Sequence, residues 1–150
     1  MERFSIGCAN AMLSKLAEEF QNGIIALYSG SQPVSAEKAE NGTLRCLITN
    51  NAGTFIPGQP ANGLNFGTPV NGEMEKAAGE RWIGNVVSTG EIKWFRFYAN
   101  DYTTGESSTA IRFDGLVGIN DSDATELLVE QTTINSADAF EVLSFKIKFA

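Results

Sequence analysis

The sequence predicts a mainly β protein, either an antiparallel β-sandwich or a jelly-roll-like barrel, with one N-terminal amphipathic helix. Apolar residues recur at helical spacing near the N-terminus, and later segments alternate apolar with polar residues. Glycine-rich turns separate these segments, and the regular exchange of helix and strand that a βαβ fold requires is absent. With 150 residues, 43% of them apolar, the chain predicts a single β-sandwich domain over residues 1–150 with a packed core.

The predicted helix spans about residues 9–21. Its apolar residues fall on one face at spacings of three and four, and polar residues fill the opposite face. The apolar face consists of Ala9, Met12, Leu13, Leu16, Ala17 and Phe20. Gly23 follows at the place where a left-handed C-terminal cap is expected.

Seven or so strands are predicted after Gly23. The segments with a period of two are 24–30, 43–50, 81–88, 91–99, 108–119, 125–134 and 140–150. Gly90 is able to adopt the positive φ of a tight turn, which predicts a hairpin between 81–88 and 91–99. Cys46 belongs to an inward row of its strand, and Ile134 is predicted on the face opposite Leu127. The inward row of the last strand is predicted to be Leu143, Phe145, Ile147 and Phe149.

Residues 50–80 predict a long Pro/Gly-rich loop or arm, with a short edge strand around 64–67. The segment holds three of the four prolines in the chain. Loops of this length in compact domains are usually functional or ordered by a partner. Its apolar residues are therefore candidates for a partner interface, and they are Phe55, Ile56, Leu64 and Phe66.

Composition excludes several kinds of chemistry. The chain has no histidine and only two cysteines, Cys8 and Cys46, so Ser-His-Asp and Cys-His catalysis and the common zinc sites are ruled out. A net charge of −7 without a basic block argues against direct nucleic-acid binding. No apolar run approaches the length of a membrane span, and the N-terminus lacks the features of a signal peptide, so we expect a soluble chain made in a cytoplasm.

Two stretches are candidates for other kinds of site. Asp121, Asp123 and Glu126 present carboxylates that are able to bind Ca²⁺ from a loop, but without EF-hand spacing, and an acidic turn is the favoured interpretation. Ser29 and Ser31 flank Gly30, yet the stretch matches neither a nucleophile elbow nor a phosphate loop. We therefore interpret residues 28–44 as a rigid connector between two strands.

Two binding or catalytic alternatives stay open. Exposed aromatic rings around the predicted hairpin would stack against sugar in a carbohydrate-binding module, although about half of them should point into the core. These rings belong to Trp82, Trp94, Phe95, Phe97, Tyr98 and Tyr102. The less favoured alternative is a carboxylate-dependent glycoside hydrolase, since the chain has 18 Asp and Glu residues, most of which are expected to be solvated.

The connector also carries a resemblance to known proteins. Tyr28-Ser29-Gly30-x-Gln32-Pro33, then Ala36-Glu37-x-Ala39 and Gly42-Thr43-Leu44, resembles a signature of small virion structural proteins of tailed bacteriophages and prophages. In that family an N-terminal helix precedes the pattern "LYSGxQPxxAxxAxxGTL". The motifs Trp82-Ile83-Gly84 and Gly90-x-x-x-Trp94-Phe95-Arg96 are similar to it as well, whereas Arg45 replaces the usual leucine.

The resemblance implies a non-enzymatic structural component of a tailed-phage virion. It implies a capsid decoration or head-surface protein, or a head-to-tail (neck or tail) accessory protein, made in the cytoplasm of the bacterial host. The expected partners are copies of the chain and other virion proteins. The resemblance carries over no catalytic residue, no cofactor and no membrane association.

Overall fold

The computed structural model describes residues 2–119, 126–138 and 140–149. Its elements are α1 (Ile6–Glu19), β1 (Ile24–Tyr28), β2 (Leu44–Asn50), β3 (Glu73–Glu75), β4 (Trp82–Val86), β5 (Gly90–Glu91), β6 (Trp94–Tyr98), β7 (Arg112–Gly118), β8 (Leu127–Val129), β9 (Thr133–Ile134) and β10 (Phe140–Lys148). The prediction of a mainly β chain with one N-terminal helix is confirmed. None of the described helices is long and apolar enough to span a membrane.

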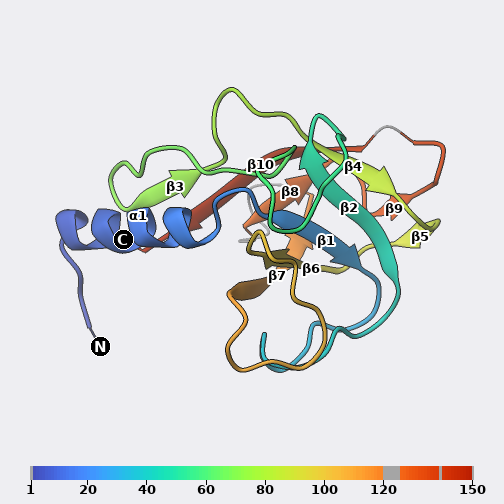
Figure 1. Ribbon diagram of the computed structural model, residues 1–150, viewed down its shortest axis with the longest axis horizontal. Helices are drawn as coiled ribbons and strands as arrows, with labels where there is room; N and C mark the ends of the chain where they lie inside the picture. The colour runs from blue at the N-terminus through green and yellow to red at the C-terminus, as the bar shows by residue number, and fades with distance from the viewer. Residues whose placement is uncertain (1, 120–125, 139, 150) are drawn as a thin grey trace.

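Seven strands close into a barrel (Figure 1). Their order is β10-β4-β2-β1-β6-β7-β8, and the pairing of β8 with β10 closes the ring. Strand β3 extends the sheet beside β10, while β5 and β9 form a separate two-stranded sheet. The closed sheet agrees broadly with the predicted barrel. It is mixed and not purely antiparallel, because β7 and β8 run parallel.

The barrel interior is the main hydrophobic core. Cys46 and Ile48 of β2 are fully buried there, so the predicted inward position of Cys46 is confirmed. Phe97 of β6 lies near the centre of an aromatic cluster, with its ring 5.7 Å from that of Phe145 and 5.5 Å from that of Phe113. Burial of such large rings is the dominant stabilising contribution to the fold.

Helix α1 begins and ends differently from the prediction. It starts at Ile6 because the Ser5 hydroxyl accepts a hydrogen bond from Cys8 N (3.1 Å), which caps the first turn. The left-handed residue after the helix is Asn22 (φ 59°), not Gly23. Gly23 is required for another reason: a Cβ there would collide with the carbonyl oxygen of Tyr98 on the neighbouring strand.

The predicted hairpin is wrong, although both of its strands form. β4 pairs with β2 and β10, whereas β6 pairs with β1 and β7, so the two strands lie apart in the barrel. Between them, Gly90 pairs with Ile134 of β9. The segment therefore crosses one end of the barrel instead of turning back on itself.

Two inward rows also differ from the prediction. The pairing of β10 with β8 shifts register between Val142 and Ser144, so Val142 is buried while Leu143 is 52% exposed. Phe149 lies past the end of β10 and is 41% exposed. Segment 125–134 breaks into β8 and β9, and this break lets Ile134 point into the same core as Leu127.

Residues 50–80 pack onto the barrel and do not form a detached arm. Leu64 is fully buried and forms an isolated bridge with Gly23, and the Phe66 ring stacks on Phe97 at 5.3 Å. A second isolated bridge, from Phe66 to Lys76, takes the place of the predicted edge strand. The segment is thus part of the core structure of this chain.

Candidate functional site

A second layer covers the outer face of β1 and β6. Strand β6 is buried on both sides, because Trp94, Arg96 and Tyr98 point away from the barrel interior and still have almost no exposed surface. Two segments lie together over this face, at the bottom of Figure 1. One is the part of the connector between β1 and β2, residues 29–43, and the other is the loop of residues 99–111. The signature stretch is therefore a lid on the barrel wall.

The side chain of Arg112 binds the backbone of the connector. The guanidinium donates hydrogen bonds to carbonyl oxygens of both covering segments, over distances of 2.6 to 3.5 Å. The acceptors are Ala36, Glu37 and Lys38 in the connector and Thr103 and Gly105 in the other loop. A single side chain thus fastens two loops to β7, and planar arginine suits this task because its five donors are fixed in direction.

Arg96 makes a second set of hydrogen bonds that holds the connector against the barrel. Its guanidinium forms two hydrogen bonds with the Asp114 carboxylate, at 2.6 and 2.8 Å, and a third with Lys38 O at 2.9 Å. Glu40 of the connector accepts from Arg96 at 3.2 Å and from the Tyr98 hydroxyl at 2.7 Å. A buried ion pair is stable only when such additional hydrogen bonds compensate for lost water, as they do here.

Burial and hydrogen bonding shift the pKa values of this network. Burial raises the pKa of Tyr28 to about 12, and burial together with hydrogen bonds to Tyr28 and Glu40 raises the pKa of Tyr98. Burial alone would raise the pKa of Glu40, but hydrogen bonds from Tyr98 and Gly105 and the charge of Arg96 lower it overall. At neutral pH the network therefore contains neutral tyrosines and an ionised Glu40, a state suited to structural support.

Ser29 of the signature has structural surroundings. Ser29 Oγ accepts a hydrogen bond from Thr43 N (3.0 Å), and Ser29 O accepts one from the Trp94 indole (3.2 Å). The contacts of Ser29 are thus to backbone and indole groups, neither of which is a general base. Gly30 and Gly42 have φ near +80° and shape the two ends of the connector.

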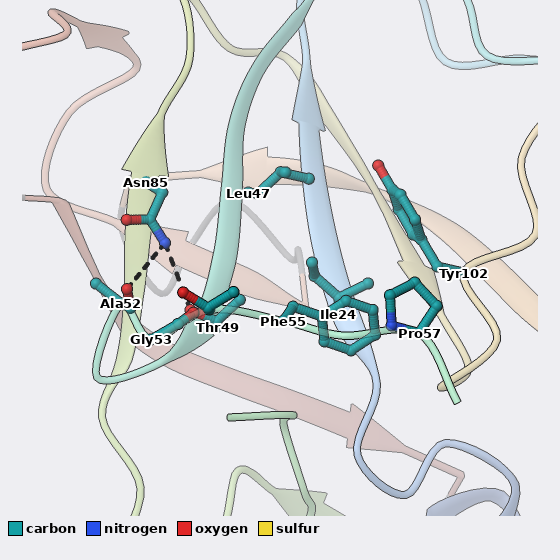
Figure 2. Close-up of a pocket in the computed structure, with 10 residues that line it drawn as sticks. Ile24, Leu47, Thr49, Ala52, Gly53, Phe55, Pro57, Asn85 and Tyr102 are labelled. Atoms are coloured by element: carbon teal, nitrogen blue, oxygen red, sulfur yellow. Dashed lines mark hydrogen bonds between the residues drawn. The ribbon is translucent and has the colours of Figure 1, made fainter. Parts of the chain in front are cut away.

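An apolar pocket opens on the barrel wall beside this lid (Figure 2). It has a volume of about 310 Å³. Ile24 and Leu47 supply apolar surface from β1 and β2, while Phe55, Pro57 and Tyr102 surround the other side. The remaining lining residues are Thr49, Ala52, Gly53, Thr54 and Asn85.

The wall formed by residues 51–57 is held in place by short contacts. Gly53 N donates to Asn50 O (3.0 Å), and the Thr49 hydroxyl donates to Gly53 O (2.8 Å). Ala52 has a φ of 56°, a left-handed conformation that costs about 1–2 kcal/mol for a residue with a Cβ. The pocket is thus largely pre-formed, which is typical of binding sites.

One end of the pocket is polar and the whole lining is uncharged. The Asn85 amide donates to Ala52 O (3.3 Å) and Thr49 Oγ1 (3.5 Å), as Figure 2 shows. None of the described lining residues is charged. A pocket of this kind suits a neutral apolar group, such as a side chain of a partner protein, and its polar groups are the hydroxyls of Thr49, Thr54 and Tyr102 and the amide of Asn85.

The structure separates the predicted interface residues. Phe55 is half-buried and lines the pocket, and the adjacent Ile56 is 49% exposed. Leu64 is fully buried in the barrel core, and Phe66 is partly buried and packs against it. The sequence did not reveal that this part of the loop packs onto the barrel, and the role of these two residues at a partner interface stays a prediction.

The candidate cation site lies mostly outside the described residues. Asp121 and Asp123 belong to the segment that the structure does not describe. Glu126 is described, and its carboxylate lies over Gly115 on β7. Within residues 2–119, 126–138 and 140–149, no group of three potential ligands is arranged to hold a metal ion.

The positions of the aromatic rings do not support the sugar-binding alternative. Trp82, Trp94, Phe95 and Phe97 have no exposed surface, and Tyr98 is 1% exposed. Tyr102 is half-buried, with its ring 4.8 Å from that of Tyr98. These six rings therefore do not form a stacking platform.

For the hydrolase alternative, the structure offers a pocket lined by two carboxylates, one of which is ion-paired. A polar pocket over β4 and β10 is lined by Glu130 and Glu141, among others. Arg81 makes two hydrogen bonds to Glu141 and lowers its pKa, which is opposite to the shift a general acid requires.

Sequence reasoning missed the polar network under the lid. The available signal was Arg96, a charged residue in the middle of the aromatic run "WFRFY". A charge in a buried strand requires a partner, and Asp114 lies directly opposite Arg96 in the pairing of β6 with β7.

Comparison with protein-family models, with curated proteins and with solved structures finds no match to this chain.

Proposed function

We propose that this protein is a non-enzymatic structural component of a tailed-phage virion that acts by packing against other protein subunits. Its place is on the capsid surface, as a decoration protein, or at the neck or tail. The observation that carries the packing function is the pre-formed, uncharged apolar pocket on the barrel wall. The virion assignment rests on the resemblance of residues 28–44 to the phage signature.

The surroundings of the signature support a structural role. Its carbonyl groups accept from Arg96 and Arg112, its Glu40 accepts from Tyr98, and its Ser29 hydroxyl accepts from a backbone amide. Each of these groups therefore contributes to a rigid lid. Rigid surfaces bind partners with a smaller loss of conformational entropy, as subunits of a particle require.

The test uses a charged variant at the pocket rim. Thr54 is exposed and lines the pocket, so Thr54→Arg blocks the pocket while the barrel stays folded. The variant is introduced into the phage or prophage that encodes the chain, and the protein is quantified in purified particles by mass spectrometry. Thr133→Arg, at an exposed position on β9, is the matched control.

We expect wild-type protein and Thr133→Arg in the particles and at least a tenfold loss of Thr54→Arg. A cryo-EM image of the wild-type particle then gives the position of the barrel. Absence of the wild-type chain from purified particles would overturn the virion assignment. Incorporation of Thr54→Arg at the wild-type level would show that the pocket is not the packing surface.

A further inference from the structure

We propose that the apolar pocket receives the N-terminal end of α1 from a second copy of this chain, with Phe4 as the inserted side chain. This inference rests on the proposed packing function and names its partner. The contact is head to tail, since it joins two different surfaces of the same protein.

The N-terminal end of α1 is an unpartnered apolar surface. Phe4 is 49% exposed and Ile6 is 52% exposed, and Gly7 and Cys8 beside them are exposed as well. Among the ten phenylalanines of the chain, only Phe4 and Phe149 are exposed. Figure 1 shows the chain before α1 leading away from the barrel.

Charge favours this pairing of surfaces. The chain carries a net charge of −7, so two copies repel each other over most of their surfaces. Residues 4–14 contain no charged side chain, the exposed residues just before them, Glu2 and Arg3, carry opposite charges, and the described lining of the pocket contains no charge. Two uncharged apolar surfaces on an otherwise acidic protein associate without burying an unpaired charge.

The geometry of one molecule excludes self-insertion. Helix α1 has 14 residues and is therefore about 21 Å long, and Phe4 is two residues before its start. The pocket begins at Ile24, beyond the opposite end of the helix, and β1 continues away from the helix in Figure 1. Phe4 of one copy is thus too far from its own pocket, and only the pocket of a second copy is within reach.

The pocket matches the proposed occupant in size and chemistry. Its volume of about 310 Å³ accommodates one large apolar side chain. Phe55 and Tyr102, whose ring centroids are 6.1 Å apart, provide aromatic partners for an inserted phenylalanine. Repetition of a head-to-tail contact generates a ring where the rotation closes, which is a common arrangement of copies around a symmetry axis.

The experiment measures molar mass by native mass spectrometry and light scattering. It compares the wild-type chain with Phe4→Ala, Thr54→Arg and Asn85→Lys, and with an equimolar mixture of Phe4→Ala and Thr54→Arg. All three substituted positions are exposed, and circular dichroism verifies that each variant is folded. Phe149→Ala is the matched control, because it removes the other exposed phenylalanine.

We expect a multimer for the wild-type chain and for Phe149→Ala, and monomers for each of the other variants alone. The mixture should form a one-to-one dimer, because the intact N-terminus of Thr54→Arg fits the intact pocket of Phe4→Ala. A wild-type monomer at every concentration, a Phe4→Ala variant that assembles as the wild type does, or a mixture that stays monomeric would each overturn the proposal. Loss of particle incorporation by Thr54→Arg together with normal incorporation of Phe4→Ala would leave the proposed function standing and this inference refuted.

Discussion

At the residue scale, Arg96 shows how the signature stretch is held in place. Its side chain has no exposed surface, and the side chain of Asp114, opposite it on β7, is 3% exposed. Removal of one partner from such a pair leaves an uncompensated charge in a low-dielectric environment, which is far more costly than loss of a surface ion pair. Because Arg96 also donates to Lys38 O, a substitution at Asp114 should affect the position of the connector as well.

We predict that Asp114→Asn lowers the free energy of unfolding by about 3 kcal/mol, because Arg96 then stays buried with Glu40, at 3.2 Å, as its remaining counter-ion. Urea denaturation followed by tryptophan fluorescence measures the change. The matched control is Glu141→Gln, which removes the exposed ion pair with Arg81 and should change stability by no more than about 1 kcal/mol. Equal effects of the two substitutions would contradict the proposed role of Asp114.

Glu40 makes the stability of the lid dependent on pH. Its pKa in the folded chain lies below the ordinary value of 4.5, so the ionised form stabilises the fold. This contribution is fully present above pH 4.5 and is lost as the pH falls through the lower pKa of the folded state. We predict that the unfolding free energy of the wild-type chain decreases below pH 4.5 more steeply than that of Glu40→Gln.

Urea denaturation of both proteins at a series of pH values tests this prediction. The series runs from about pH 3 to about pH 7, because this range spans the ordinary carboxyl pKa of about 4. Glu40→Gln should be less stable than the wild type at pH 7, since it removes a charged acceptor from Tyr98 and Arg96. The difference should shrink toward the acidic end. Parallel curves would show that Glu40 does not titrate with folding.

At the element scale, local periodicity predicted which segments are regular but not how they pair. The apolar stripe from Ala9 to Phe20 identified α1, yet the start of the helix depends on one hydrogen bond to Ser5. Gly90 suggested a tight turn, but it lies in β5 and pairs with Ile134, a contact with a distant segment that local sequence does not show. The inward row of β10 failed at Leu143 because a register shift reverses the alternation after it begins.

The long segment 50–80 gives the clearest test at this scale. We predict that Leu64→Ala lowers the unfolding free energy by about 2–5 kcal/mol, because Leu64 is fully buried and leaves a cavity. Ile56→Ala in the same segment should change it by no more than about 0.5 kcal/mol, since Ile56 is 49% exposed. Chemical denaturation of both variants distinguishes a packed segment from a detached arm, for which both effects would be small.

At the scale of the whole molecule, closure of the sheet and the position of the pocket were not predictable. Closure depends on the pairing of β8 with β10 and on the parallel pairing of β7 with β8, which are contacts between distant or unusually oriented segments. Of the predicted interface residues, Phe55 and its neighbour Ile56 lie at or beside the pocket, while its floor residues, Ile24 and Leu47, looked like ordinary strand residues. Composition alone, in contrast, excludes chemistry that requires histidine, because the chain contains none.

The two cysteines report on opening of the closed barrel. Cys8 is exposed, whereas Cys46 is fully buried in the core, and burial raises its thiol pKa to about 12. We predict that a thiol reagent modifies Cys8 at once in the native protein and Cys46 only through unfolding, because a closed sheet has no edge strand to detach. Mass spectrometry of quenched samples follows both reactions, with Cys8→Ser as the control that isolates Cys46.

Since about 1.4 kcal/mol corresponds to a factor of ten, Asp114→Asn should accelerate modification of Cys46 on the order of a hundredfold or more and leave the modification rate of Cys8 unchanged. Equal rates at Cys8 and Cys46 in the wild-type chain would mean that the barrel opens locally beside β2.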